Sequence, residues 1–380
     1  MTKPVSVLIV AGETSGDLLG ASIIRELKKY KNYSFWGFGG DNMSKEKTEI
    51  LFHCDKMATI GFWEGIKRYF FFKNLMRKVV NEAAKRKPKA AILIDFSGFN
   101  IRLAAALYKL KIPCYKVVSS QIWAWNYKRI YKIKKYFKSV LCLYDFEIDL
   151  YEKEKASAFF MGHPLVDSAK ASLEKYKIKK NSFRNASQIK KNPNIALLPG
   201  SRISEINRHL PFLIELAKSL RKENSRAKFI IPASAESIEN KIRNFNPPSY
   251  ITISNKGTHH TLLWADAAVA CSGTVTLECA LFETPFLIIY KTSTLTFMIG
   301  KKVVKIPYIG MVNMLYKDFL AKEFLQHDMT IKNVLPELKN ILFNDNYRKE
   351  MRKKLISVQK SLGKGSASKK AASYLNKNIK

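Results

Sequence analysis

Short apolar runs alternate with stretches of helical periodicity along most of this 380-residue chain. In the first half, four such runs predict strands: Val5–Val10, Ser34–Phe38, Lys89–Ile94 and Pro113–Ser119, and a further apolar run, Val140–Leu143, follows them. The stretches between them carry apolar residues at helical spacing. Strands that alternate with helices in this way predict a doubly wound parallel sheet.

A second series of strands follows a polar, lysine-rich stretch. It comprises Ile195–Leu198, Lys228–Pro232, Tyr250–Ile253, Ala267–Ala270 and Pro285–Tyr290. The chain is therefore predicted to be an α/β protein with Rossmann-like domains at 1–167 and 194–345, joined by a linker at 168–193. A basic helical tail covers 346–380, and packing of this tail against the first domain is one alternative. Two such domains leave a cleft between their loop edges, where we expect a two-substrate site.

Two loops in the second half join the end of a strand to the start of a helix. Pro199–Arg202 follows one buried strand, and Ser272–Thr274 follows another. A tight glycine loop before a helix aims N–H groups and a positive helix end at an anion. Arg202 adds a guanidinium fork suited to a phosphate. Either loop alone has an ordinary turn as its alternative, but the two together indicate a phosphate-binding edge.

Carboxylates follow two strands of the first domain. Glu13 and Asp17 lie in a loop without the G-x-G-x-x-G spacing of a dinucleotide site, and two acids there would repel a pyrophosphate. They suit sugar hydroxyls, or cap a helix. Asp95 ends the strand Lys89–Ile94 on the ligand edge of the sheet. It is a candidate general base, with a helix-capping role as the alternative.

The segment Ile60–Met76 combines aromatic and basic residues. Three consecutive phenylalanines point around much of a helix, so at least one face should be exposed. Such a segment, too short to span a bilayer, is typical of an interfacial membrane element. A buried helix is the alternative. We favour membrane contact through Lys67, Arg68, Tyr69, Phe70, Phe71, Phe72 and Met76.

The charge balance is strongly basic, with 66 Lys and Arg against 31 Asp and Glu and a net charge of +35. Such a charge indicates an anionic partner, whether nucleic acid, membrane or phosphorylated substrate. The lysines are dispersed, so compositional bias is the alternative. No signal peptide or apolar run of roughly 18 residues is visible. The five cysteines lack metal-site spacing. We expect reduced thiols, a cytoplasmic protein, no metal and no cofactor.

A series of motifs covers nearly the whole chain in order. They are AGETSGD (Ala11–Asp17), IGFWE (Ile60–Glu64), Asp95 with Phe99-Asn100, VSSQIWAW (Val118–Trp125) with Lys128-Arg129, FMGHP (Phe160–Pro164), LLPGSRISEI (Leu197–Ile206), SGTVTLE (Ser272–Glu278) and VNML (Val312–Leu315). Together they resemble the lipid-A-disaccharide synthases, an inverting glycosyltransferase family of the two-Rossmann GT-B class.

The resemblance implies a metal-independent transfer from UDP-2,3-diacylglucosamine to 2,3-diacylglucosamine 1-phosphate. The products would be the β(1→6) lipid A disaccharide 1-phosphate and UDP. Because both substrates are diacylated, it also implies a peripheral protein on the cytoplasmic face of the inner membrane, with no nucleic-acid partner. A homodimer is one alternative for the oligomeric state.

The same resemblance implies roles for particular residues. Asp95 is the candidate base, and Arg202 the cation for the departing diphosphate. Glu278 is the candidate ligand of the ribose hydroxyls. The donor-side candidates are Gly200, Ser201, Arg202, Ser272, Gly273, Thr274, Glu278 and Asn313. The acceptor-side candidates are Glu13, Ser15, Asp17, Glu64, Asn100 and His163.

The chain departs from the family pattern at three places. Ser97-Gly98 stands where Pro-Asp is frequent, Ser120-Gln121 where Pro-Ser is usual, and Asp145 where proline is usual. These departures bear on loop geometry and acyl-chain preference. One rival is another GT-B UDP-GlcNAc enzyme, such as a 2-epimerase or a soluble-acceptor transferase, which would have no use for Tyr69–Met76. A more distant rival is a basic nucleic-acid-binding protein, although no binding module is visible.

Overall fold

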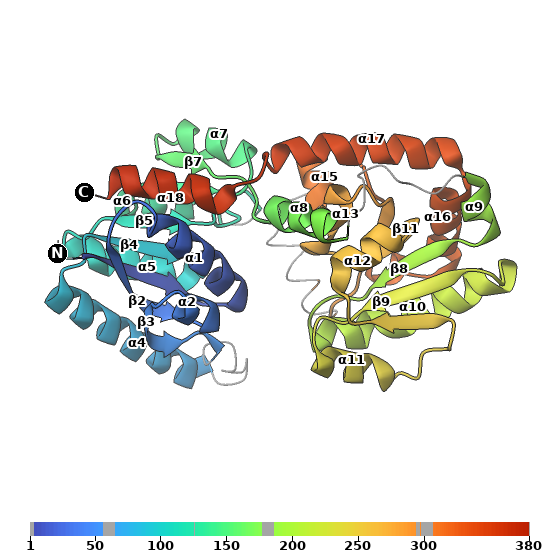
Figure 1. The fold of residues 1–380 in the computed structure, drawn as a ribbon, viewed down its shortest axis with the longest axis horizontal. Helices are drawn as coiled ribbons and strands as arrows, with labels where there is room; N and C mark the ends of the chain where they lie inside the picture. Colours follow the sequence, from blue (N-terminus) through green and yellow to red (C-terminus); the bar gives the residue numbers. More distant parts are fainter. Residues whose placement is uncertain are drawn as a thin grey trace. The chain divides into compact units, whose positions relative to one another are not determined.

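A computed structural model describes residues 4–55, 65–124, 126–176, 186–293, 297 and 307–379, except for the side chains of 65–69 and 186. The chain divides into two compact units. Unit 1 comprises residues 1–164 and 362–380, and unit 2 comprises residues 165–361. Each unit contains one parallel sheet with helices around it (Figure 1). The predicted α/β fold with two doubly wound sheets is confirmed.

The sheet of unit 1 has seven strands in the order β3-β2-β1-β4-β5-β6-β7. These are β1 (Val5–Ala11), β2 (Tyr33–Gly39), β3 (Glu49–His53), β4 (Ala90–Ile94), β5 (Cys114–Val117), β6 (Ser139–Cys142) and β7 (Ala158–Phe160). Parallel strands covered on both faces are apolar throughout their length rather than alternating. Every residue of β4 is accordingly buried.

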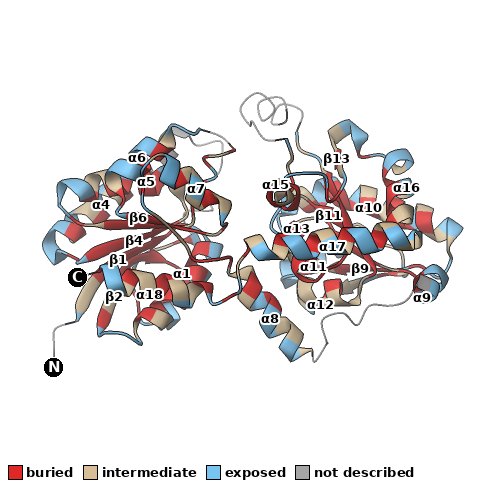
Figure 2. Ribbon diagram, turned by 90° about the horizontal axis from the view of Figure 1, so that it is seen from above, coloured by how far each residue is buried: buried red, intermediate tan, exposed pale blue. Residues whose placement is uncertain are grey.

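Helices enclose a separate apolar core on each face of this sheet (Figure 2). One core contains Leu75, Leu103 and Ile130. The other contains Ile23 and Leu375. The helices of unit 1 are α1 (Thr14–Leu27), α2 (Asp41–Lys45), α4 (Gly65–Arg86), α5 (Ser97–Lys109), α6 (Arg129–Tyr136), α7 (Phe146–Lys153) and α18 (Ala367–Asn378).

The sheet of unit 2 has six strands in the order β10-β9-β8-β11-β12-β13. These are β8 (Asn194–Leu198), β9 (Lys228–Pro232), β10 (Ile251–Ser254), β11 (Ala267–Cys271), β12 (Phe286–Tyr290) and β13 (Glu323–Leu325). Its helices are α8 (Leu165–Lys175), α9 (Ala186–Lys191), α10 (Ile203–Glu223), α11 (Glu236–Arg243), α12 (Gly257–Trp264), α13 (Val275–Leu281), α15 (Met311–Tyr316), the short 3₁₀ helix Gln326–Asp328, α16 (Ile331–Phe343) and α17 (Asp345–Ser361).

The unit boundaries differ from the predicted ones. The stretch predicted as a linker contains α8 and α9, and α8 packs against α12 and α13 inside unit 2. Buried Val166 and Ala169 explain this packing, which the exposed polar positions around them concealed in the sequence. The predicted tail also divides, because α17 belongs to unit 2 and α18 to unit 1.

The helix α18 is held in unit 1 by apolar and polar contacts. Its alanines and Leu375 join the core beside α1. The Tyr33 hydroxyl donates to Asn376 Oδ1 at 3.0 Å, and the Phe159 and Tyr374 rings stack with centroids 4.4 Å apart. The C-terminal helix therefore completes the first unit.

The strand order reverses between β1 and β4 in unit 1, and between β8 and β11 in unit 2. In open α/β sheets, ligands bind outside the carboxyl ends of the strands at this reversal. The loops there carry Glu13 and Asp95 in unit 1, and Arg202 and Ser272 in unit 2. The fold therefore brings the sequence-predicted residues of each unit to one edge of its sheet.

Candidate active site

A cavity of about 1080 Å³ lies in unit 1, beside the loops that follow β1, β4 and β5. Helices α4, α5 and α6 complete its walls. It is lined by Glu13, Phe72, Lys73, Met76, residues 95–99, Arg102, residues 118–122 and Arg129. Glu13 and Asp95, predicted from separate motifs, thus line the same cavity.

Asp95 lies on a tight turn between β4 and α5. Its backbone φ is +45° and that of Phe96 is +39°, an uncommon conformation for residues other than glycine. The Asn100 amide supports this turn by donating to the carbonyl oxygens of Ile94 (3.1 Å) and Asp95 (2.9 Å). Asn100 is fully buried. Its amide nitrogen thus holds the backbone that presents Asp95, while its Oδ1 has no hydrogen-bond partner among the described residues, so its predicted contact with the acceptor stays a prediction.

Aromatic rings form one wall of the cavity. The centroids of Phe72, Phe96 and Phe99 lie 5.6 to 5.9 Å from one another. These distances are typical of packed aromatic pairs. Met76 lines the same cavity from α4. The wall offers a continuous apolar surface within reach of Asp95.

The aromatic segment predicted to contact a membrane divides between solvent and core. Phe70 is 55% exposed. Phe71, Phe72 and Met76 are instead partly buried against the core of unit 1, so less of their surface is available for lipid than the prediction assumed. These side chains pack against the core cluster, and the periodicity of the sequence did not predict this contact. Glu64 and the side chains of Lys67, Arg68 and Tyr69 lie outside the described residues. No helix in the described parts of the chain combines the length and apolarity needed to cross a bilayer.

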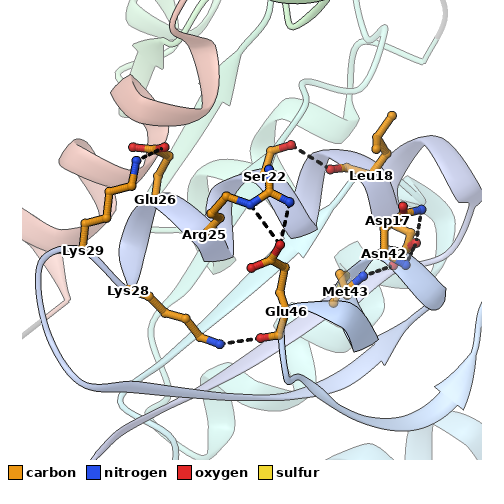
Figure 3. A network of polar contacts seen from close by, with 10 residues as sticks. All are labelled: Asp17, Leu18, Ser22, Arg25, Glu26, Lys28, Lys29, Asn42, Met43 and Glu46. Carbon is orange, nitrogen blue, oxygen red and sulfur yellow. Dashed lines mark hydrogen bonds and ion pairs between the residues drawn. The ribbon is translucent and has the colours of Figure 1, made fainter.

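Asp17 has a structural role (Figure 3). Only 1% exposed, it accepts hydrogen bonds from the backbone N–H groups of Gly40 (2.7 Å), Asn42 (3.0 Å) and Met43 (3.1 Å). The Asn42 side-chain amide donates a further bond at 2.9 Å. The carboxylate therefore caps the N-terminus of α2, and the acceptor-side prediction for Asp17 is wrong.

The remaining acceptor-side candidates lie in different environments. Glu13 is exposed and lines the cavity, whereas exposed Ser15 is outside the lining formed by the described residues. His163 is also outside that lining and is 8% exposed, with its ring 5.6 Å from that of Tyr144. Burial lowers the pKa of His163 to about 4. Of these three residues, Glu13 is the one that lines the cavity.

Two buried charged residues near the cavity were not among the candidates predicted from the sequence. Lys116 on β5 is 0% exposed, and burial lowers its pKa to about 8. Glu147 on α7 is 1% exposed, and burial raises its pKa to about 7. The signal that could have found Lys116 is a lysine inside the apolar run Cys114–Val117.

In unit 2, Glu205 already occupies the predicted anion loop after β8. Its Oε2 accepts from the backbone N–H groups of Ser201 (2.9 Å) and Arg202 (3.2 Å). A Cβ on Gly200 would lie 2.4 Å from the same oxygen, so this glycine allows the close approach. The prediction of free N–H donors at Ser201 and Arg202 is therefore wrong. The Arg202 guanidinium, 3.3 Å from Glu205 Oε1, belongs to a side chain that is 77% exposed.

His209, which was not predicted from the sequence as a site residue, supports this loop through two hydrogen bonds. The backbone N–H of Lys291 donates to its Nε2 at 3.0 Å. Nδ1 must therefore carry the proton, which it donates to the Pro199 carbonyl at 2.9 Å. Fully buried, His209 ties the start of the loop to the end of β12. Its position one turn after Glu205 on a predicted helix gave no sequence signal for this role.

The loop after β11 presents Gly273 and Thr274 to solvent. Gly273 has a φ of +158° and open space around the position of a Cβ. Ser272 is partly buried, and its hydroxyl donates to the Ile309 carbonyl at 3.0 Å. The exposed backbone of this loop can therefore approach a ligand, while Ser272 anchors it.

Glu278 takes part in a chain of hydrogen bonds across three helices. Its Oε1 lies 3.0 Å from Nε2 of His259 on α12, and Nδ1 of that histidine lies 2.7 Å from the Ser172 hydroxyl on α8. The His259 ring also packs against Phe282 with centroids 4.8 Å apart. Glu278 is therefore held in place by this chain of hydrogen bonds.

Asn313 is fully buried and organises the chain between β12 and β13. Its Oδ1 accepts from the N–H groups of Leu320 (3.0 Å) and Ala321 (2.9 Å), and its Nδ2 donates to the Ala321 carbonyl (2.7 Å) and to Glu323 (2.8 Å). These bonds use both ends of the amide. The predicted contact of Asn313 with the nucleotide is therefore wrong, because its polar atoms are already bonded within unit 2.

One group among the described residues brings metal-ligand atoms together. Donor atoms of His53, Cys54 and Asp55 lie within 4.8 Å of one another. Burial raises the pKa of the Cys54 thiol to about 11, which disfavours the thiolate that a metal would require. All five cysteines are buried and free, as predicted.

The family model for "Lipid-A-disaccharide synthetase" matches residues 7–378. A lipid-A-disaccharide synthase of Coxiella burnetii (strain CbuG_Q212) is 38% identical over 375 residues, covering 98% of each chain. One of Myxococcus xanthus (strain DK1622) is 32% identical over 381 residues, covering 98% of this chain and 97% of the relative.

Two solved structures show the same fold at low identity. A UDP-GlcNAc 2-epimerase from Neisseria meningitidis has a TM-score of 0.62 at 13% identity, covering 98% of this chain and all of the other. MurG of Acinetobacter baumannii has a TM-score of 0.54 at 14% identity, covering 98% and 99%. At these identities the likeness shows the fold alone, whereas the family relatives are similar in sequence over nearly the whole chain.

Proposed function

This chain belongs to the lipid-A-disaccharide synthase family and is a glycosyltransferase, and we propose that it joins UDP-2,3-diacylglucosamine to 2,3-diacylglucosamine 1-phosphate. The products are the β(1→6) lipid A disaccharide 1-phosphate and UDP. One structural observation carries the proposal of where this occurs: Asp95 lines a cavity of about 1080 Å³ at the reversal of strand order in unit 1.

Asp95 acts as the general base in this proposal. The 6-hydroxyl oxygen of the acceptor attacks the anomeric carbon of the donor, and the bond from that carbon to the diphosphate breaks. The hydroxyl proton passes to the Asp95 carboxylate, which must lie within hydrogen-bond reach of it. The turn held by Asn100 fixes the carboxylate-bearing backbone before the acceptor arrives.

The cavity suits an acylated sugar phosphate. Phe72, Phe96 and Phe99 offer an apolar wall for an acyl chain. Lys73, Arg102 and Arg129 line the same cavity and supply positive charge for a phosphate. A transferase with a soluble acceptor would have no use for the apolar wall, so this wall favours the lipid acceptor.

The donor nucleotide is assigned to the loops after β8 and β11. Glu205 occupies the N–H groups of Ser201 and Arg202, so we assign the diphosphate to the Arg202 guanidinium, which is exposed although it also pairs with Glu205. The exposed backbone at Gly273 and Thr274 adds N–H donors at the start of α13. Glu278, held by His259, accepts from the ribose hydroxyls.

The enzyme works as a peripheral protein on the cytoplasmic face of the inner membrane in this proposal. Its diacylated substrates reside in the lipid surface, and the net charge of +35 favours anionic lipid, at about 1 kcal/mol for each well-placed Lys or Arg. Exposed Phe70 on α4 supplies an apolar contact. Of the three consecutive phenylalanines, Phe70 is the most exposed, whereas Phe71 and Phe72 are partly buried against the core.

The direct test is disaccharide formation in detergent with EDTA present. Wild type should form the product, and Asp95→Asn should lower kcat by about 10²-fold or more while UDP binding is unchanged. Asp149→Asn, which alters a carboxylate on α7, is the matched control. Arg202→Ala should reduce both UDP affinity and kcat, against Arg226→Ala as its control. Full activity of Asp95→Asn would remove the proposed base, and the absence of disaccharide from wild type would overturn the proposed reaction.

A further inference from the structure

A lysine is completely buried beside the Asp95 cavity. Lys116 is 0% exposed on β5, and its Nζ donates to the Ser97 hydroxyl at 3.1 Å. A buried ammonium is unfavourable unless hydrogen bonds or opposite charge compensate its lost hydration. Asp95 and Glu147 act on it with opposite charge. The proposed general-base mechanism gives this lysine no role.

A chain of hydrogen bonds leads from Lys116 through Ser97 to Ser120 at the cavity. The Ser97 and Ser120 hydroxyl oxygens lie 2.7 Å apart, and both residues line the cavity. An ammonium has donors and no acceptor, so a lone pair of Ser97 must accept from Lys116. Two hydroxyl protons then remain, and one of them joins the two serines. The other proton has no acceptor among the described residues, so it is available to a ligand in the cavity.

The charges around this serine pair favour an anion. Arg129 lines the cavity and lies close enough to Lys116 for their charges to repel. Hydrogen bonds in a chain polarise one another, so the lysine strengthens the terminal hydroxyl as a donor. A hydroxyl donor backed by one buried cation and flanked by a second is suited to a phosphate oxygen.

The serines are also departures from the family pattern. Ser97 and Ser120 stand where the resemblance leads us to expect proline, which has no hydroxyl and cannot form this chain of bonds. Gly98 stands beside them where an aspartate is frequent, and this removes a negative charge from the cavity. All three differences act in the same direction, towards binding of an anion.

We propose that Lys116, Ser97 and Ser120 form the subsite for the phosphate monoester of the acceptor sugar, with the serine hydroxyls as ligands and Lys116 as the residue that polarises them. The subsite rests on the proposed function, because it takes the acceptor to be a sugar 1-phosphate. It places the phosphate at the start of α5, beside the Asp95 turn that receives the attacking hydroxyl.

The test compares two probes by calorimetry in detergent: 2,3-diacylglucosamine 1-phosphate and the same compound without its phosphate. In the wild type the phosphate should strengthen binding. Ser97→Ala and Ser120→Ala should each weaken binding of the phosphorylated probe by about tenfold, as expected for a lost hydrogen bond to a charged group. Binding of the other probe should change by less than about twofold. Ser97→Thr, which keeps the hydroxyl, should restore binding, and Ser22→Ala on α1 is the matched control.

Lys116→Met should show the same selective loss, and the serine variants keep the test decisive if this variant fails to fold. Equal weakening of both probes would overturn the subsite, because it would indicate a general change in the cavity. A rise in the KM of the UDP donor, with acceptor binding unchanged, would overturn it by assigning the hydroxyls to the donor diphosphate. If wild type forms no disaccharide, the proposed function fails. If it forms disaccharide and the serine variants bind both probes normally, the subsite alone fails.

Discussion

Nε2 of His259 lies 3.0 Å from Oε1 of Glu278, and the other ring nitrogen of the histidine lies 2.7 Å from the Ser172 hydroxyl. Because α12, α13 and α8 each supply one member, the position of the Glu278 carboxylate depends on side chains that make no proposed contact with substrate. A carboxylate held in one orientation loses less side-chain entropy when it accepts from a ribose than a mobile one does. If Glu278 binds the ribose as proposed, His259 acts as a positioning residue for the nucleotide.

His259→Phe should keep the ring packing against Phe282 and remove both hydrogen bonds. We expect about a fivefold loss of UDP affinity, which corresponds to roughly one neutral hydrogen bond. Binding of 2′-deoxy-UDP should change less, since it lacks one hydroxyl for Glu278. Calorimetry with both nucleotides measures the difference, and His260→Phe, whose ring meets Tyr176, is the neighbouring control. Equal losses for both nucleotides would show that His259 does not act through Glu278.

A second prediction separates the two acids of the loop after β1. Asp17→Asn should destabilise unit 1 by about 1–3 kcal/mol, because the carboxylate caps α2 through three backbone N–H groups. The KM of the folded variant for the acceptor should stay unchanged. Glu13→Gln should show the reverse pattern, since Glu13 is exposed in the cavity. Thermal unfolding and acceptor KM, measured on both variants, test the assignment. A normal melting temperature together with a raised KM for Asp17→Asn would contradict it.

The sequence was sufficient to predict the sheets and their ligand edges, because buried parallel strands are continuous apolar runs that periodicity detects. The edge strands β3, β7 and β13 were not predicted. β3 (Glu49–His53) has exposed and half-buried positions, and its residues give no such run. Similarly, the polar residues around Val166 and Ala169 concealed α8 as part of unit 2.

The candidate site was predicted less completely, because motif residues do not reveal what their polar atoms bond. Asp17, Asn100 and Asn313 all belong to the motifs, yet each uses its side chain to hold backbone. Conversely, Lys116 and His209 belong to no pattern of spacing, and long-range packing places them next to the site loops. Such pairings depend on tertiary structure, which a single sequence does not specify residue by residue.

The pKa of His163 leads to a prediction about acid stability. Burial lowers this pKa to about 4, against about 6.5 in an unfolded chain. Between these values the unfolded state binds more protons, so the stability is fully present above pH 6.5 and is lost as the pH falls towards 4. The loss from this residue is at most about 3.4 kcal/mol.

His163→Phe should therefore flatten the decline in stability between pH 6.5 and 4. Urea unfolding at several pH values measures the slope for wild type and variant. His53→Phe is the control, since His53 is a half-exposed histidine of the same unit. A slope equal to that of wild type in His163→Phe would mean that other groups cause the acid sensitivity.

The last prediction concerns the surface of α4. Phe70 and Tyr131 are each 55% exposed in unit 1 and both lie on basic helices, but only α4, which carries Phe70, is proposed to contact lipid. If the start of α4 inserts into lipid, Phe70→Ser should weaken binding to vesicles containing anionic phosphatidylglycerol, because an apolar ring leaves the interface. We expect a loss of about fivefold or more, consistent with the transfer free energy of a partly buried phenylalanine.

Tyr131→Ser should leave vesicle binding unchanged and serves as the matched aromatic control. Sedimentation with vesicles at two salt concentrations separates the apolar contribution from the electrostatic one, since only the latter is screened by salt. The loss caused by Phe70→Ser should therefore persist at high salt. If the two variants bind alike, the net charge alone would account for membrane attachment, and α4 would serve the enzyme through Phe72 and Met76 in the wall of the acceptor cavity.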